Sequence, residues 1–203
     1  MKKIALFVFL LAVCVAAGRA QESRQDISLS GYGLIEPYIA STTDVQVHSN
    51  YALGALLSYR FMLTPSSAVE ANYGITYQNK IHYLISNTNN YTVLTRTQEM
   101  SADYVRSFNF RKYNPFVEAG PGAVIFLPIR NSGTTTLDAK QQTQMAAFYG
   151  AGIAREVSPS FDIRAEFRGI VTKVPTFNDT AQQFTTNKWY NIYSPVIGVA
   201  YHF

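Results

Sequence analysis

Apolar and polar side chains alternate along several stretches of the chain. The clearest is 161–171, FDIRAEFRGIV, in which charged residues occupy every second position from Asp162 to Arg168. The same two-residue period occurs in 51–61 and 69–77. A period of two is typical of a β-strand with one apolar and one polar face. None of these segments has the 3.6-residue period of an amphipathic helix, so the pattern predicts an all-β protein.

Two kinds of connection separate these segments. Short turn signals with Pro, Ser or Asn occupy residues 63–68, 110–115 and 157–160. Longer polar stretches occupy residues 41–49, 86–92, 130–142 and 174–187. Short and long connections alternate strictly and leave eight segments, which predicts eight antiparallel strands joined consecutively. In two of them, 27–39 and 143–156, the alternation is too weak to choose the apolar face.

The first twenty residues are typical of a secretory signal peptide. Two lysines precede the apolar run IALFVFLLAVCVAA, and small residues lead to a cleavage site after it. Cys14 raises the alternative of a lipoprotein, but it lies inside the apolar run and follows Val13, a poor residue at that place. We therefore expect residues 1–20 to be removed and residues 21–203 to form one domain.

Removing the signal peptide changes the charge and the chemistry of the chain. The whole chain has a formal net charge of +4, and loss of Lys2, Lys3 and Arg19 leaves +1, so the sequence gives no case for nucleic-acid binding. Cys14 is the only cysteine, which leaves the mature chain without a disulfide or a thiolate metal site. No later stretch approaches the roughly 18 apolar residues of a membrane-spanning helix, so the chain either is soluble or crosses a membrane as strands.

Two barrel architectures fit eight alternating strands. In a soluble, lipocalin-like barrel the apolar faces turn inward, and the rows rich in Tyr and Phe would overfill the interior. In a transmembrane barrel the apolar faces meet lipid, the polar faces line the lumen, and short turns alternate with long loops. The secretion signal, the connections and the aromatic strand ends favour the second. We predict an eight-stranded antiparallel up-and-down transmembrane β-barrel, closed because an open sheet edge in hydrocarbon leaves backbone groups unpaired.

The chain ends in VIGVAYHF, an alternation that runs to the last residue. This ending resembles the C-terminal signature of bacterial outer-membrane barrels. The mature sequence is similar to the small eight-stranded OmpA-like family, including the segment NPFVEAGPGA at 114–123. The resemblance implies that the barrel-assembly machinery reads Tyr201 and Phe203, that the barrel lies in the bacterial outer membrane, and that both termini are periplasmic. We expect no peptidoglycan-binding domain and no role in tethering the envelope to the cell wall.

An eight-stranded barrel has an interior just wide enough for side chains to fill. The strand registers send charged residues of both signs into this lumen: Arg60, Glu70, Glu99, Asp103, Glu118, Asp162, Arg164, Glu166 and Arg168. Charges in so narrow a space must be paired or solvated. One interpretation is a salt-bridge network that plugs the barrel, and the other is a narrow polar path that admits ions. The sequence favours the plug.

Candidate catalytic and metal-binding residues are few. An outer-membrane lipid A deacylase resembles a serine hydrolase, which needs a base within hydrogen-bond reach of its nucleophile. The three histidines, His48, His82 and His202, are scattered, and none forms a His-x-Ser pair. They also lack the spacing of metal ligands. We therefore expect no enzymatic activity, no cofactor and no metal.

The outer ends of the strands carry aromatic residues suited to the membrane interface. Trp189 and Tyr190 are predicted to lie in an interfacial girdle, with Tyr51 and Tyr83 on neighbouring strands. The long loops are low in charge and select no surface partner. We expect a monomer whose contacts are outer-membrane lipid, lipopolysaccharide and the barrel-assembly machinery. The sequence predicts a structural or surface-interaction role, with a low-conductance channel for ions or small polar solutes as the alternative.

Overall fold

The structure, a computed structural model, describes residues 24–40, 45–77, 79–85, 89–108, 110, 113–133, 139–177 and 188–203. The expected signal peptide, residues 1–20, lies outside these described residues. Within them, no helix has the length and hydropathy that crossing a membrane requires.

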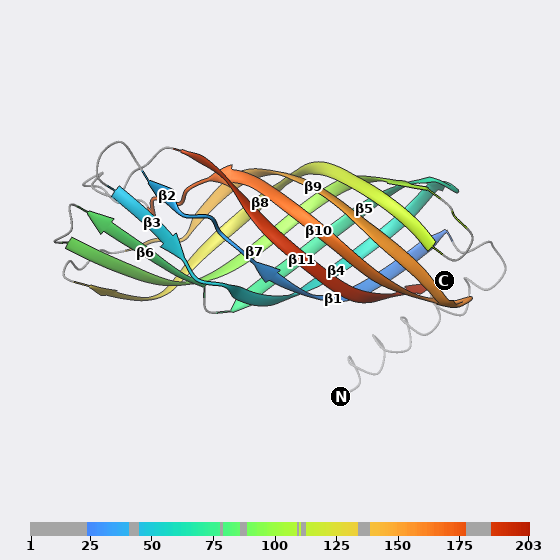
Figure 1. The fold of residues 1–203 in the computed structure, drawn as a ribbon, viewed down its shortest axis with the longest axis horizontal. Helices are drawn as coiled ribbons and strands as arrows, with labels where there is room; N and C mark the ends of the chain where they lie inside the picture. Colours follow the sequence, from blue (N-terminus) through green and yellow to red (C-terminus); the bar gives the residue numbers. More distant parts are fainter. Residues whose placement is uncertain are drawn as a thin grey trace, which may run out of the picture.

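The described strands form one antiparallel sheet that closes on itself (Figure 1). In chain order they are β1 (Gln25–Leu34), β2 (Ile39–Ala40), β3 (Val45–Ser49), β4 (Ala52–Thr64), β5 (Ser67–Tyr77), β6 (Asn79–Ile85), β7 (Asn89–Ser107), β8 (Tyr113–Gly133), β9 (Gln142–Ser158), β10 (Phe161–Lys173) and β11 (Trp189–His202). The sheet order is β2-β3-β6-β7-β5-β4-β1-β11-β10-β9-β8, and an additional pairing of β7 with β8 closes the ring.

We call each segment that spans the barrel from one end to the other a wall. Three of these walls are each built from two consecutive strands. β1 continues into β2, β3 into β4, and β5 into β6, with a short interruption in each case. The pairings of β2 with β3, β3 with β6 and β6 with β7 extend those of β1 with β4, β4 with β5 and β5 with β7. The strands therefore make eight walls, and the predicted closed eight-stranded antiparallel barrel is confirmed.

The two ends of the barrel differ. The short β4–β5, β7–β8 and β9–β10 connections share one end with Gln25 and His202, and we call it the turn end. The opposite end, where the other connections lie, is the loop end, on the left of Figure 1. Asp26 pairs with His202, so the last strand closes the barrel against the first.

Burial alternates along the strands in the predicted registers. In 51–61, 69–77 and 161–168 the predicted apolar rows face outward, and the polar side chains face the lumen together with Ala52 and Leu56. Because successive side chains of a strand point to opposite faces, a single correct position fixes the whole strand. The predicted faces of these segments are confirmed.

The two undecided segments carry large apolar residues on both faces. In 27–39, Tyr32 faces the lumen while Leu29 faces outward. In 143–156, Phe148 faces the lumen, and its neighbour on the other face is also aromatic. Hydrophobicity therefore cannot choose the face, and pairing with the neighbouring strands does.

Three of the long polar stretches are shorter as loops than predicted. Residues 45–49 form β3, residues 89–92 belong to β7, and residues 130–133 belong to β8. These segments pair with neighbouring strands at the loop end. Polar composition was a wrong guide to the strand ends, because the backbone hydrogen bonds of a sheet do not depend on side-chain polarity.

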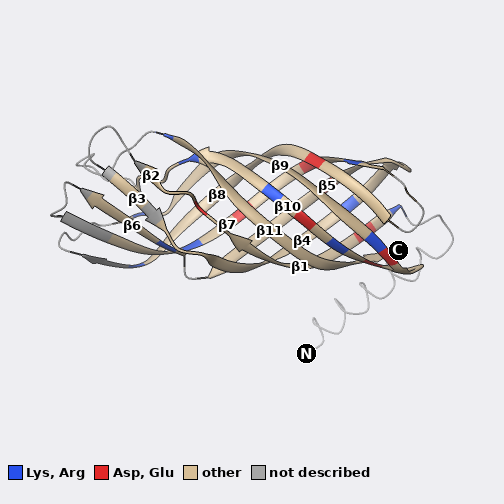
Figure 2. Ribbon diagram, viewed as in Figure 1, with Lys and Arg blue, Asp and Glu red and all other residues tan. Residues whose placement is uncertain are grey.

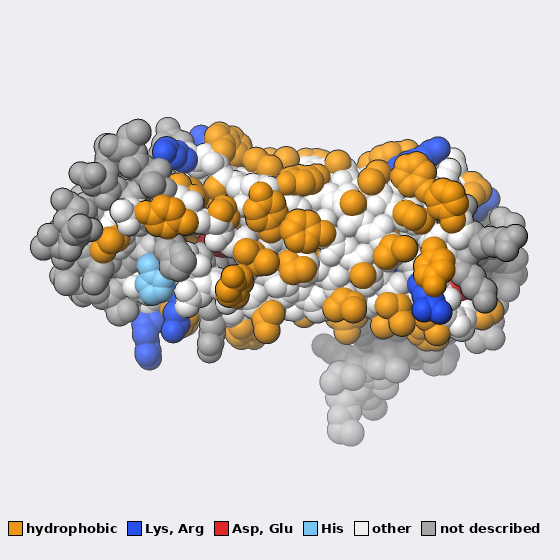
Figure 3. All heavy atoms as spheres, in the orientation of Figure 1, with side chains coloured by type: hydrophobic (Ala, Val, Ile, Leu, Met, Phe, Trp, Pro, Cys, Tyr) orange, Lys and Arg blue, Asp and Glu red, His pale blue; other side chains and the backbone are white. Residues whose placement is uncertain are grey.

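An apolar band lies between two levels of positive charge on the outer wall. On β7, Arg96 and Arg106 lie on the outward face, with Met100, Ala102 and Tyr104 between them. Their ten-residue separation corresponds to roughly 33 Å along a strand, and to roughly 25 Å along the bilayer normal at a tilt of about 40°. This is the height of the apolar band of transmembrane barrels, and Figure 3 shows basic side chains towards both ends of the visible face.

Candidate functional site: the barrel lumen

The charged side chains of the central barrel point into the lumen. Figure 2 marks acidic and basic positions in the central part of the wall, whereas the outer surface of that part in Figure 3 shows hydrophobic and uncharged side chains. All nine side chains of the expected network face the lumen, and at most 10% of the surface of any one is exposed. The ion pairs divide them into two groups along the barrel axis.

Arg168 is the centre of the first group and is fully buried. Its Nη1 donates to Glu99 Oε1 at 2.7 Å, and its Nε donates to Glu118 Oε1 at 3.2 Å. Asp103 and Glu166 complete the group, with ion-pair distances of 3.5 Å and 3.6 Å to the guanidinium. Four carboxylates from β7, β8 and β10 therefore surround one cation and join the walls of the barrel across its interior.

Arg60 and Arg164 form the second group, nearer the turn end. Arg60 Nε donates to Glu70 Oε2 across the β4–β5 pair. Arg164 Nη2 donates to Asp26 Oδ2 at 2.7 Å, and its Nη1 lies 3.9 Å from Glu70. These contacts tie β10 to β1 and β5, which lie on other parts of the ring.

Two residues of this second group were missed as network members by sequence reasoning. Asp26 is fully buried and contacts Arg164, and His202 Nε2 lies 2.9 Å from Asp162 Oδ2. A cavity of about 300 Å³ at the turn end is lined in part by Arg60, Asp162 and His202. The sequence did contain a signal for Asp26. Asp26, Ser28 and Ser30 occupy every second position of β1 and therefore lie on the face opposite Ile27 and Leu29.

Carboxylates outnumber guanidinium groups in the lumen. Eight described acidic residues face inward: Asp26, Glu36, Glu70, Glu99, Asp103, Glu118, Asp162 and Glu166. The inward-facing arginines are Arg60, Arg164 and Arg168, and the other described lysines and arginines are partly or fully exposed. The lumen therefore has an excess of acidic groups, which attracts cations and repels anions.

Apolar side chains fill much of the loop-end half of the lumen, which the sequence analysis did not predict. A cluster of buried side chains from most of the walls lies there, including Tyr83, Phe126, Ile192 and Phe177. The Phe177 ring meets the rings of Tyr83 and Phe126 edge to face, with centroids 6.2 Å and 6.5 Å apart. This cluster, which we call the apolar plug, lies nearer the loop end than the Arg168 group.

Hydrogen bonds to the backbone of residues 174–177 hold the Phe177 ring in the plug. Gln142 Oε1 accepts hydrogen bonds from the backbone N–H groups of Thr176 and Phe177 at 2.7 Å and 2.8 Å. The Tyr83 hydroxyl donates to Pro175 O at 2.8 Å. Phe177 has a φ of 51°, a left-handed conformation that costs an L-residue roughly 1–2 kcal/mol. Burial of a Phe side chain contributes about 1.5–3 kcal/mol, enough to offset that cost.

The four aromatic residues expected in the interfacial girdle lie on different faces of the barrel wall. Trp189 is 60% exposed on the outer wall, with Lys173 Nζ 5.5 Å from its ring centroid. Tyr51 is also exposed. Tyr190 and Tyr83 were wrongly assigned to the girdle, because both are buried in the apolar plug. Tyr190 follows Trp189 directly in a strand, so the two side chains must point to opposite faces.

The two histidines whose side chains the structure describes lie in different parts of the barrel. His82 Nδ1 lies 2.8 Å from the Thr92 hydroxyl, and His202 belongs to the lumen network. The side chain of His48 lies outside the described side chains. Among the residues that the structure describes, no group of three or more His, Cys, Asp and Glu side chains is arranged to hold a metal ion.

A closed eight-stranded barrel with an apolar outer band and inward-facing charges defines a small transmembrane β-barrel of the outer-membrane type. The family model "Outer membrane protein beta-barrel domain" matches residues 5–203, and the chain belongs to this family. The resemblance to small outer-membrane barrels drawn from the sequence is thereby confirmed. Comparison with curated protein sequences gives no match.

Solved structures of small outer-membrane barrels are similar in fold. Neisserial surface protein A (NspA) has a TM-score of 0.58 at 12% sequence identity, covering 89% of this chain and 98% of that chain. The outer membrane protein OprG from Pseudomonas aeruginosa has a TM-score of 0.59 at 9% identity, covering 90% and 97%. The N-terminal β-barrel domain of Pseudomonas aeruginosa OprF has a TM-score of 0.50 at 16% identity, covering 90% and 100%. At these identities the likeness shows the fold alone.

Proposed function

We propose that this chain is an integral outer-membrane barrel with a closed lumen and a structural or surface-interaction role. The observation that supports the proposal is the filling of the lumen at two successive levels. Arg168 and its four carboxylates occupy one level, and the apolar plug with Phe177 occupies the next. A hydrated ion would have to cross both. The role then falls to the outer wall and the loops rather than to flow through the barrel, and it involves no enzymatic reaction.

The orientation in the membrane follows from the two ends of the barrel. Outer-membrane barrels have short periplasmic turns and longer extracellular loops. The first described strand starts and the last one finishes at the turn end, so we place the two termini in the periplasm and the loop end towards lipopolysaccharide and the cell exterior. We propose a monomer, inserted by the barrel-assembly machinery, that meets its surface partners through the loops.

A narrow channel for cations is the second candidate function. The excess of lumen carboxylates over arginines favours it, because such a lining concentrates cations. For conduction, the ion pairs of Arg168 would have to exchange partners and the apolar plug would have to move aside.

Single-channel conductance in planar bilayers tests both candidates. We expect no discrete steps from the refolded wild-type protein, and steps from Arg168→Ala if the Arg168 group is the tighter closure. Arg155→Ala, which removes an exposed arginine of β9, is the matched control and should stay silent. Heat-modifiable migration on gels shows that each variant is folded. Cation-selective steps from the wild type that change in Arg168→Ala would replace the closed barrel by the channel.

A further inference from the structure

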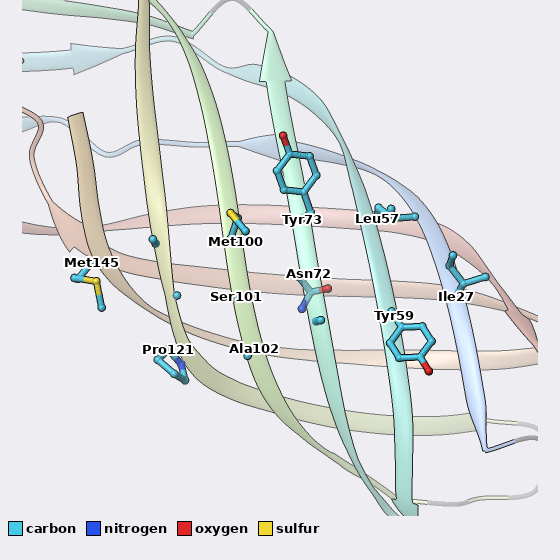
Figure 4. A pocket seen from close by; sticks show the side chains of 13 residues that line it. Ile27, Leu57, Tyr59, Asn72, Tyr73, Met100, Ser101, Ala102, Pro121 and Met145 are labelled. Carbon is cyan, nitrogen blue, oxygen red and sulfur yellow. The ribbon is translucent and has the colours of Figure 1, made fainter. Parts of the chain in front are cut away.

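A hollow in the lipid-facing wall is distinct from the lumen. It has a volume of about 660 Å³ and is lined by residues of β1, β4, β5, β7, β8 and β9 (Figure 4). Its floor follows one row of paired residues, in which Ile27 lies opposite Tyr59, Tyr59 opposite Ala71, and Ala71 opposite Ala102. Pro121 of β8 extends the lining. We call this hollow the wall groove.

The groove exists because small residues lie between large ones. Ala71, Ala102 and Pro121 leave the backbone of three adjacent walls thinly covered. In Figure 4 the ring of Tyr73 points towards the loop end and that of Tyr59 points the opposite way. The Tyr59 hydroxyl donates to Gln25 Oε1 at 2.7 Å, which holds this ring towards the turn end. The floor between the two rings is therefore open to the membrane.

Flexible side chains border the groove on its loop-end side. Met100 and Met145 are both exposed and lie in the row next to the small residues. Methionine has an unbranched side chain that adapts to irregular apolar partners. The volume falls within the range of about 300–1,000 Å³ found for sites that hold one small organic molecule. The lining thus suits a single flexible hydrocarbon chain.

A fixed cation lies on the same strand at the edge of the apolar band. Arg106 is four residues beyond Ala102 on β7, which corresponds to roughly 13 Å along the strand and roughly 10 Å along the bilayer normal. Its Nη1 donates to Ser67 Oγ at 2.8 Å, and the Tyr104 hydroxyl donates to the same oxygen at 2.9 Å. Half of the hydrocarbon core is about 15 Å thick, so an acyl chain whose phosphate is at Arg106 reaches the groove.

We propose that the wall groove binds one acyl chain of an anionic glycerophospholipid from the leaflet at the turn end, with the lipid phosphate at Arg106. The apolar lining provides the contact for the chain, and the exposed guanidinium complements the phosphate charge. Arg24 and Arg155 are further exposed cations towards this end, against the single exposed acid Glu156 among the described residues of the outer wall. The site is separate from the lumen, so it does not depend on the proposed closed barrel.

A second barrel is the competing occupant. Specific protein interfaces bury roughly 1,200–2,000 Å² and need two surfaces that fit closely. Here Tyr59, Tyr73 and Met145 stand out from the wall around a recessed floor, and a flat barrel wall cannot fill that recess. A thin flexible chain fits between these side chains, which favours the lipid.

Native mass spectrometry of the detergent-solubilised protein titrated with dipalmitoyl phosphatidylglycerol tests the proposal. We expect one bound lipid per wild-type barrel. Ala102→Phe fills the groove and should weaken retention about tenfold, whereas Ala165→Phe, at an outward alanine of β10 away from the groove, should leave it unchanged. Arg106→Gln should weaken retention about fivefold, and dipalmitoylglycerol, which lacks the phosphate, should bind wild type and Arg106→Gln equally.

Several outcomes would overturn the proposal. Equal retention by Ala102→Phe and Ala165→Phe would mean that the lipid binds elsewhere on the wall. A lipid-free dimer that Ala102→Phe dissociates would make a second barrel the occupant. Heat-modifiable migration verifies folding, and if Ala102→Phe does not fold, Ala71→Leu tests the same floor. Loss of retention in Ala71→Leu supports the site, and unchanged retention removes it.

Discussion

A buried guanidinium is stable only where carboxylates surround it, and Arg168 meets four of them. Removing one partner of a buried ion pair leaves the other charged, desolvated and uncompensated, which costs more than the pair contributes when it is intact. The same reasoning applies to any single carboxylate of the lumen, with a smaller effect because each carboxylate is one of several around Arg168. The loss of stability caused by a lumen substitution therefore depends on how many opposite charges the residue contacts.

Arg168→Ala should lower the free energy of unfolding by about 3–5 kcal/mol, because it leaves Glu99, Glu118 and their neighbours without a cation. Urea titration of the folded protein in detergent micelles measures this change. Arg155→Ala is the matched control, since Arg155 is exposed and its visible contact is the Tyr113 ring at 5.5 Å. The control should change stability by about 1 kcal/mol or less. Equal effects of the two substitutions would contradict a structural role for the Arg168 group.

Glu36 should make the stability of the barrel depend on pH. It lies past Leu34, outside the apolar band, where Asn79 Nδ2 donates to its Oε1 at 2.7 Å. Burial raises the pKa of Glu36 from 4.5 to about 7, although hydrogen bonds from Asn79 and Ser49 oppose the shift. Between these two values the folded protein holds a proton that the unfolded chain releases. The free energy of unfolding therefore falls as the pH rises from about 4.5 to about 7, and levels off above.

Glu36→Gln removes this titration and keeps an oxygen that can accept from Asn79. We expect the variant to be more stable than wild type at about pH 8 and no more stable at about pH 4.5. Urea midpoints at the two pH values provide the measurement. The same pH dependence in both proteins would assign the titration to another group.

At the scale of elements, the segment 174–177 shows how a stretch with loop composition becomes part of the lumen. Its sequence, VPTF, follows β10 directly and contains a proline, which is typical of a strand end. In the structure Gln142 of β9 and Tyr83 of β6 hold its backbone, and Phe177 turns inward. These partners are far from it in sequence, so local pattern contains no information about the contact.

Two substitutions of Phe177 separate the ring from its backbone. Phe177→Ala should destabilise the barrel by about 3–5 kcal/mol, because it empties a buried aromatic site. Phe177→Gly removes the same ring but relieves the left-handed φ, so it should be less destabilising than Phe177→Ala by about 1 kcal/mol. Urea unfolding of the two variants side by side gives the difference. If Phe177→Ala is as stable as Phe177→Gly or more so, Phe177 does not hold a positive φ in solution.

At the scale of the whole molecule, the barrel is closed by the pairing of its first and last described strands. β1 and β11 pair from Asp26 and His202 to Tyr32 and Val196. Beyond this ladder the Phe203 N–H donates to Gln25 O at 3.0 Å, and the Tyr201 ring stacks on that of Phe203 with centroids 6.1 Å apart. The last residue is therefore part of the seam and is also where the assembly signal is expected.

Deletion of Phe203 should reduce the fraction of protein that reaches the heat-modifiable, folded form in the outer membrane. The reason is the combined loss of the terminal aromatic expected to be read during assembly and of its seam hydrogen bond. Phe203→Tyr keeps both an aromatic ring and the backbone donor, and should assemble as wild type does. Gel migration of unheated membrane samples measures the folded fraction. Normal assembly of the deletion would remove Phe203 from the proposed signal.

The sequence by itself determined the walls of this barrel and the faces of most of them. A strand has a period of two, so segments such as 161–168 predict which side chains meet lipid and which meet the lumen, without any tertiary contact. The inward position of Arg168 follows from this local rule, and the number of walls follows from the alternation of short and long connections. Local rules also explain why Trp189 is correctly placed on the outer wall.

Only the tertiary structure decided which side chains meet one another inside the lumen. Asp26 meets Arg164, and Phe177 meets Tyr83, through contacts between strands that are distant in the sequence. The wall groove likewise exists because Ala71 and Ala102 meet in one row. The physical reason is common to all of these features. Register between strands and contacts across a closed barrel join residues far apart in the chain, whereas hydrophobic alternation reports on one strand at a time.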